Sequence, residues 1–142
     1  MTVISSAEEL LPHGDLVDVR FLKFSAEALD EPRPNFEDGD IEQTMQVVVG
    51  GSETAIEVRV DLTLLTATAT YEVLAATQFH YAEGLEVSAE VAGEFAEKVG
   101  VMAVYPYLRE AIQDFSGRLR NGPITIALMR QTKLTPADPA ED

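Results

Sequence analysis

The sequence of 142 residues lacks cysteine and tryptophan altogether and contains only two histidines. Without cysteine, the chain has no disulfide framework, no thiolate ligand for zinc and no cysteine nucleophile. It also lacks any apolar run of the roughly 18 residues that a membrane-spanning helix needs. Its first ten residues, MTVISSAEEL, have neither the basic region nor the apolar region of a secretory signal peptide. These absences predict a cytoplasmic protein that is not inserted into a membrane.

Basic residues are scarce as well, because 10 lysines and arginines stand against 25 aspartates and glutamates, for a formal net charge of −15. Contacts with phosphates need lysine and arginine, so this balance argues against binding to nucleic acid or to an anionic membrane surface. The same charge favours solubility and would attract a basic partner. Hydrophobic residues make up 46% of the chain, which at this length is enough for one domain with its own core.

Four segments have the residue pattern of β-strands: 16–27, 41–49, 55–65 and 69–81. In residues 55–65, apolar and polar residues alternate strictly, which predicts one face on a core and one face in water. The alternation in residues 16–27 changes phase after Phe21, which indicates either a β-bulge or a strand with both faces partly covered. The expected hairpin turn at residues 66–68 contains none of the usual turn residues.

Two helices are expected after the strands. Apolar residues recur every four positions between 85 and 99, which predicts an amphipathic helix that Ser88 caps and Gly100 ends. Pro106 suits the first position of a second helix, which the sequence Asn-Gly-Pro at 121–123 ends. The apolar stripe of this second helix consists of Leu108, Ile112, Phe115 and Leu119.

Strands followed by helices predict an α+β fold, with a four-stranded antiparallel sheet and the helices packed on one face. We place this single domain at residues 15–132. Residues 1–14 are expected to form a flexible arm with a short helix that Ser6 caps. Residues 124–129 are predicted to be a strand or an extended arm, and the acidic residues 133–142 a disordered tail.

Few residues are suited to catalysis. The sequence contains no Gly-x-Gly-x-x-Gly, P-loop or Gly-x-Ser-x-Gly motif. Neither His13 nor His80 has a second histidine at ligand spacing, so we predict no metal site and no cofactor. The one candidate acid–base pair, His80 and Glu72, would be about 26 Å apart on a straight strand. We therefore predict that the protein is not an enzyme, and a small-ligand-binding α+β domain stays open as an alternative.

Apolar residues are more numerous than two helices can cover, which predicts oligomerisation or a peptide groove. Residues 104–119, VYPYLREAIQDFSGRL, resemble the signature helix of SecB-type export chaperones, with its aromatic-Pro-aromatic step followed by Arg109 and Glu110. The order of the expected strands over residues 16–130 is similar to that of this family. The resemblance implies a four-stranded sheet with helices on one side and a homotetramer built as a dimer of dimers. It also implies binding of non-native polypeptides in long apolar grooves, without ATP or a cofactor.

On this resemblance we predict a chaperone that holds unfolded preproteins between its second helix and the edge of the sheet. Aromatic and aliphatic side chains near that helix would line the client-binding groove, namely Phe79, Tyr81, Tyr105, Tyr107 and Leu108. The rest of the helix stripe would form the oligomer interface, namely Ile112, Phe115 and Leu119.

Two features of the sequence depart from the export members of that family. Their first strand carries an acidic residue that docks the SecA motor, and the matching position here is Lys23, while Glu27 matches a second acid. Lys23 argues against a SecA-type motor as a partner. The end of the signature helix and the following TIALMR run are more similar to SecB-like chaperones of toxin–antitoxin systems. A dedicated chaperone that protects an antitoxin is therefore an alternative function.

Overall fold

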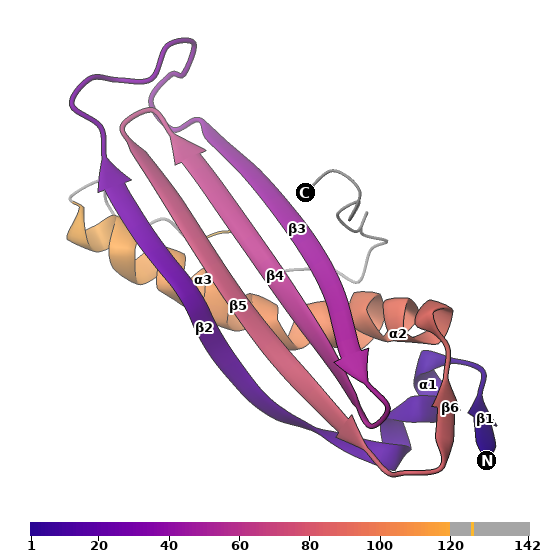
Figure 1. Ribbon diagram of the computed structural model, residues 1–142. Helices are drawn as coiled ribbons and strands as arrows, with labels where there is room; N and C mark the ends of the chain where they lie inside the picture. Colours follow the sequence, from indigo (N-terminus) through magenta and orange to yellow (C-terminus); the bar gives the residue numbers. More distant parts are fainter. Residues whose placement is uncertain (120–125, 127–142) are drawn as a thin grey trace.

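A computed structural model describes residues 1–119 and 126, and its largest element is a four-stranded antiparallel sheet (Figure 1). The strands lie in the order β2-β5-β4-β3. They are β2 (Gly14–Ala28), β3 (Ile41–Ser52), β4 (Ala55–Thr66) and β5 (Ala69–Tyr81). All four predicted strands and the antiparallel hairpins that connect β3, β4 and β5 are thereby confirmed.

One long helical segment crosses a single face of this sheet (Figure 1). It consists of α2 (Ala89–Phe95), a π-helical turn η2 (Ala96–Gly100) and α3 (Val101–Arg118). Ser88 caps α2 as predicted, because its Oγ accepts a hydrogen bond from the Val91 amide at 3.1 Å. The α+β fold with helices on one face of the sheet is confirmed.

The prediction that Gly100 ends one helix and Pro106 begins another is wrong, because Pro106 lies inside α3. The buried stripe on this segment continues from Phe95 through Val101 to Leu108, so one continuous helix covers the sheet. Gly100 lies directly on β4, where a Cβ atom would come within 2.5 Å of Cγ2 of Val58. Glycine at position 100 therefore allows the helix to approach the sheet closely, and it does not end a helix.

The N-terminal residues pack against the domain instead of forming the flexible arm that we expected. Strand β1 (Thr2–Ile4) pairs in parallel with β6 (Leu85–Val87), and α1 (Ala7–Leu10) and the 3₁₀ turn η1 (Leu11–His13) lead into β2. Ile4, Ala7 and Leu10 are buried, which supplies the apolar contacts that hold this segment in place. The predicted cap of α1 is confirmed, since Ser6 Oγ accepts from the Glu9 amide at 3.1 Å.

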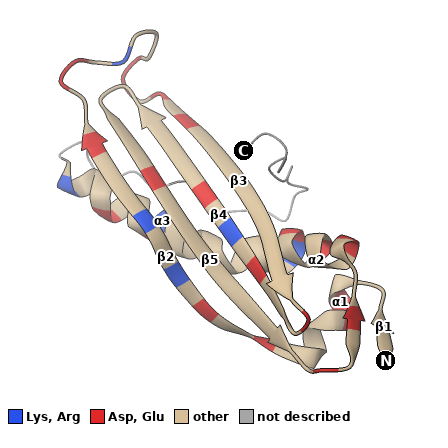
Figure 2. Cartoon of the chain, viewed as in Figure 1, with Lys and Arg blue, Asp and Glu red and all other residues tan. Residues whose placement is uncertain are grey.

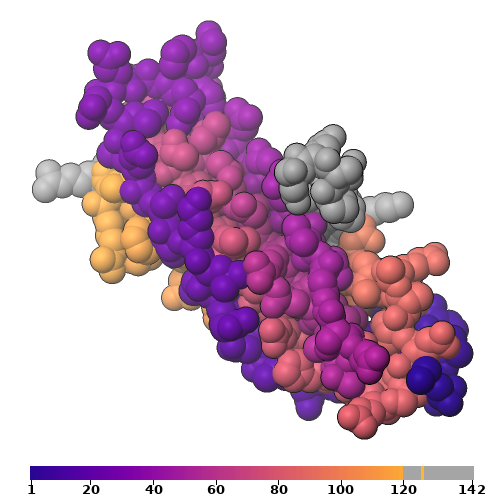
Figure 3. Space-filling model, viewed as in Figure 1, coloured from indigo at the N-terminus to yellow at the C-terminus, as the bar shows by residue number. Residues whose placement is uncertain are grey.

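The two faces of the sheet differ in character. The helix-facing side chains of β4 and β5 form much of the core, and the largest fully buried ones among them are Tyr71, Phe79, Leu62 and Leu64. The opposite face, here called the outer face, is the one seen in Figure 3, where α3 is visible only at the margin beside β2. Charged residues of both signs lie along the strands (Figure 2), and the ion pairs Lys23–Glu72 and Arg59–Glu57 lie on the outer face.

No helix among residues 1–119 is long and apolar enough to cross a membrane. The predicted strand or arm at residues 124–129 lies outside the described residues except for Ile126, which is buried in the core. The carbonyl oxygen of Ile126 accepts a hydrogen bond from Nε of Arg109 on α3 at 2.8 Å. The predicted tail at residues 133–142 lies outside the described residues.

Candidate functional site

A β-bulge in the edge strand β2 brings two phenylalanines to one face of the sheet. Residues three apart on a regular strand point to opposite faces. The pairing of β2 with β5 shifts between Phe21 and Lys23, so that Leu22 is an extra residue. Phe21 thus lies opposite Ala75 and Phe24 opposite Val73, both of which face the helix. The bulge proposed from the phase change in the sequence is confirmed.

These two phenylalanines form one wall of a groove of about 370 Å³ between β2 and α3. The opposite wall comes from Tyr107, Ala111 and Phe115 of α3. The rings of Phe24 and Phe115 are 3.8 Å apart, centroid to centroid, and those of Phe21 and Phe24 are 6.1 Å apart. Three rings therefore form a continuous row across this hollow, which we call the β2–α3 groove.

The β2–α3 groove is open and its margin is acidic. Phe21 is 48% exposed and Tyr107 is 45% exposed, so both present large apolar surfaces to solvent. Glu110 and Asp114 line the helix side of the groove. Asp114 forms an ion pair with Arg118 at 3.3 Å, whereas Glu110 forms no ion pair with the described part of the chain. Such a surface favours apolar side chains that are flanked by basic ones.

The residues suited to catalysis are not brought together. His80 is exposed, and its Nε2 lies 3.1 Å from Oε1 of Gln78. Glu72 is ion-paired with Lys23 instead of with His80. Among residues 1–119 and Ile126, no three side chains of the metal-binding types gather into a group that would hold a metal ion. The described residues thus present an exposed apolar groove and no assembled acid–base or metal centre.

Comparisons with known proteins agree with this reading of the surface. No protein-family model matches the chain. Over 138 residues, 95% of this chain and 90% of the relative, the sequence is 33% identical to the SecB-like chaperone SmegB of Mycolicibacterium smegmatis. It is also 36% identical over 64 residues, 44% of this chain, to the SecB-like chaperone Rv1957 of Mycobacterium tuberculosis.

The chain belongs to the SecB-like chaperones. A solved structure of Rv1957 has the same fold, with a TM-score of 0.75 and 25% identity, and the match covers 87% of this chain and 96% of that one. In that structure, Rv1957 is in complex with a ChAD peptide from the Rv1956 HigA1 antitoxin. The chaperone function predicted from the signature helix is confirmed.

Of the groove residues predicted for this SecB-like chaperone, only Tyr107 lies in the β2–α3 groove. Phe79, Tyr105 and Leu108 are instead buried in the core, because they face the sheet–helix interface, and they present almost no surface to a client. Phe79 packs on Phe95 at 4.5 Å between ring centroids. Tyr81 is also largely buried and lies at the far end of β5, beside other hollows.

The three residues predicted for the oligomer interface do not form one exposed surface. Ile112 is fully buried beneath α3 within one chain, so it is not available for a contact between copies. Phe115 lines the β2–α3 groove next to Tyr107, and Leu119 is partly buried against the core. The stripe on α3 is hence mainly the core-facing side of the helix, as the amphipathic pattern alone predicts.

Lys23 lies on the outer face, paired with Glu72, which raises the pKa of the lysine through a hydrogen bond and charge attraction. Asp61 on β4 is the neighbour of this pair. Burial raises the pKa of Asp61, the Glu72 carboxylate raises it further, and Lys23 opposes both effects. One oxygen of Asp61, Oδ1, is buried with no hydrogen-bond partner in the described part of the chain. The position matched to the SecA-docking acid is therefore a lysine engaged by acidic neighbours.

Sequence reasoning did not assign Phe21, Phe24, Glu110 or Asp114 to the site. Phe24 follows the phase change of β2, so its face depends on where the bulge falls. The phase change in the sequence could have placed Phe24. Only one extra residue between Phe21 and Phe24 brings both rings to the core side of the sheet. The two acids carry no pattern of their own, since exposed carboxylates occur on most helices.

Proposed function

We propose that this SecB-like chaperone holds unfolded polypeptides in the β2–α3 groove without ATP or a cofactor. The observation that carries the proposal is the row of Phe21, Phe24 and Phe115 beside the half-exposed Tyr107. Aromatic rings bury a large area at a small cost in conformational entropy, so they suit ligands of variable sequence. We further propose that the protein has no enzymatic activity and that it is located in the cytoplasm.

The edge strand β2 offers a second type of contact to an extended chain. Within the described residues β2 pairs with β5 on one side and has no strand on the other. A client segment in extended conformation can form backbone hydrogen bonds along such an edge, while its side chains enter the adjoining groove. This combination favours exposed unfolded chain over any particular sequence motif.

A light-scattering assay tests the holding function. We expect an equimolar amount of the protein to suppress the aggregation of chemically denatured citrate synthase on dilution. Tyr107→Asp should weaken suppression several-fold, because it places a charge among the rings. The matched control is Ile41→Asp, since Ile41 is 49% exposed and lies at the start of β3. Unchanged aggregation in the presence of the wild-type protein would contradict the proposal.

We also propose that the protein assembles as a homotetramer, a dimer of dimers. Leu16, Val17 and Leu22 on the edge strand β2 are large, apolar and exposed, which is typical of a surface that another chain covers. Sedimentation at micromolar concentration should give about four times the 15.5 kDa of one chain. A monomer in this measurement would contradict the proposed tetramer. If Tyr107→Asp changed the mass of the assembly, the β2–α3 groove would be assigned to assembly rather than to clients.

A second candidate function is the protection of a dedicated antitoxin. The observation that favours it is the solved complex of the relative Rv1957 with an antitoxin peptide. We expect co-purification with an antitoxin from the same host, and a slower loss of that antitoxin when the chaperone is present. The export alternative predicts retention on immobilised SecA, which the Lys23–Glu72 pair on the outer face disfavours. Binding to SecA with no effect on any antitoxin would reverse this preference.

A further inference from the structure

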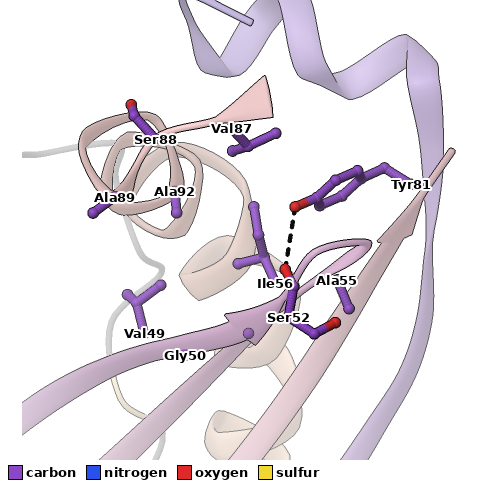
Figure 4. Close-up of a pocket in the computed structure, with 11 residues that line it drawn as sticks. Val49, Gly50, Ser52, Ala55, Ile56, Tyr81, Val87, Ser88, Ala89 and Ala92 are labelled. Carbon is purple, nitrogen blue, oxygen red and sulfur yellow. Dashed lines mark hydrogen bonds between the residues drawn. The ribbon is translucent and has the colours of Figure 1, made fainter. Parts of the chain in front are cut away.

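A second hollow lies at the opposite end of the molecule from the tip of α3, between the start of α2 and the hairpin that joins β3 to β4 (Figure 4). It has a volume of about 250 Å³. Its side-chain walls are small and apolar, and they come from Val49, Ile56, Val87, Ala89 and Ala92. Since about 150 Å³ is enough to enclose a benzene-sized group, this hollow has room for one leucine or phenylalanine side chain.

The floor of this hollow is backbone rather than side chain. Gly50 and Gly51, at the end of β3, leave the main chain uncovered there. Strand β3 pairs only with β4 among the described residues, so its outer edge is free to accept an extended segment. Tyr81 closes one end, and its hydroxyl donates to the Ser52 carbonyl oxygen at 3.4 Å (Figure 4).

An adjoining hollow of about 530 Å³ is lined by three glutamates and also by Met1, the N-terminal residue. The two hollows share Ser52, Tyr81 and Val87, so they form one continuous surface. Glu53, Glu83 and Glu86 line the second hollow, and neither lining contains a lysine or an arginine. Within the described residues, none of these three glutamates forms an ion pair. Glu53 lies in the turn between β3 and β4, Glu83 lies in the turn before β6, and Glu86 lies on β6.

We propose that these two hollows together bind a short extended peptide segment in which an apolar side chain is followed by lysine or arginine. The apolar side chain would enter the hollow beside Ala92, and the basic side chain would lie among the three glutamates. Their negative charge favours a basic side chain over a neutral or acidic one. We call this surface the end site. The inference rests on the proposed function, because unfolded clients are the source of such segments.

The end site accounts for Tyr81, which the β2–α3 groove does not include. Tyr81 is mostly buried, but it contributes to the walls of both hollows. A client that crosses the molecule would thus meet apolar contacts at two separated places, one at each end of the helical segment. Because the glutamates are exposed, each attraction is weak and falls with added salt.

Fluorescence anisotropy with labelled hexapeptides tests the end site on the full chain. The probes are Lys-Leu-Lys-Leu-Lys-Leu and two analogues with glutamine or glutamate in place of each lysine. The test variant changes three glutamates to glutamine, Glu53→Gln, Glu83→Gln and Glu86→Gln. The matched control makes the same change in charge at exposed positions near the other end of the sheet, Glu31→Gln, Glu37→Gln and Glu42→Gln.

We expect the test variant to bind the lysine peptide about fivefold more weakly than the control variant at low salt, and both to bind the glutamine peptide alike. Ala92→Leu, which fills the apolar hollow, should weaken binding of both these peptides. Equal affinity of the test and control variants for the lysine peptide would overturn the end site. Failure of the wild-type protein to suppress client aggregation would contradict the proposed function instead, so the two failures are distinguishable.

Discussion

The ring of Phe24 on the edge strand β2 lies 3.8 Å, centroid to centroid, from the ring of Phe115 on α3. This contact joins the sheet edge to the last part of the helix, and it exists because the bulge at Leu22 turns Phe24 toward α3. The β2–α3 groove is open beside this contact, with Phe21 and Tyr107 exposed along it. The same bulge thus determines both the packing of α3 and the apolar surface that we assign to clients.

The aromatic contact predicts measurable coupling between its two members. Phe24→Leu and Phe115→Leu should each destabilise the protein, and the double variant should lose less than the sum. The difference should be about 0.5–1.5 kcal/mol, as is typical of stacked aromatic pairs. Urea unfolding of the four proteins measures it. Strictly additive losses would show that the two rings do not interact in solution.

Gly100 should not tolerate a side chain. A Cβ atom there would come within 2.5 Å of Val58 Cγ2, so Gly100→Ala should lower the free energy of unfolding by about 1–3 kcal/mol. Val58→Ala in the same chain should restore part of that loss, because it removes the contacted methyl groups. The matched control is Gly93→Ala in α2, where nothing lies within 4 Å of the new atom. That change should raise stability by about 0.5–1 kcal/mol, and equal effects at both glycines would contradict the packing.

Asp61 should destabilise the fold at neutral pH. Its folded-state pKa is raised above the usual value of 3.8, chiefly by burial, so the folded state favours the protonated form. Protonated Asp61 therefore stabilises the folded state. This stabilisation is complete below the unfolded-state pKa and is lost as pH rises through the folded-state pKa. Asp61→Asn should therefore raise Tm at pH 7, with a gain that shrinks toward pH 3.5. Asp38→Asn, in an exposed loop, should change Tm little at either pH.

Arg33 should stabilise the turn between β4 and β5. Its guanidinium donates to the Thr66 carbonyl at 3.2 Å and to Thr70 Oγ1 at 2.7 Å. Lysine cannot reproduce this forked geometry, so Arg33→Lys should cost about 1–2 kcal/mol in urea unfolding. Arg118→Lys, at the exposed end of α3, provides the comparison and should cost less than about 0.5 kcal/mol. Equal costs would show that Arg33 has no special role.

The same turn shows how far the sequence alone predicts this fold. Alternation predicted β4 and β5, but residues 66–68 lack turn residues, and the structure explains why a hairpin still forms there. Thr66 Oγ1 accepts from the Ala69 amide at 3.0 Å, and Arg33 reaches in from a distant loop. Contacts between residues more than thirty positions apart leave no local pattern, so no reading of periodicity reveals them.

In the helices and the site, by contrast, strong local sequence patterns led to wrong predictions. Pro106 and Gly100 are typical of helix ends, yet burial of one continuous stripe stabilises a single helical segment through both. Of the two tyrosines beside Pro106 that the sequence assigned to a groove, only Tyr107 lines the β2–α3 groove, because the face of each ring depends on packing against the sheet. Phe24 could be placed only once the bulge at Leu22 was located.

The central claim is that unfolded chains bind in the β2–α3 groove, and site-specific photo-crosslinking tests it most directly. The photoreactive residue p-benzoylphenylalanine would replace Tyr107, or Val48 on the outer face as a control of similar exposure, 45% against 48%. During refolding of a denatured client, irradiation should link the client to position 107 and leave position 48 largely unlinked. Equal crosslinking from both positions, or crosslinking from position 48 alone, would contradict this account.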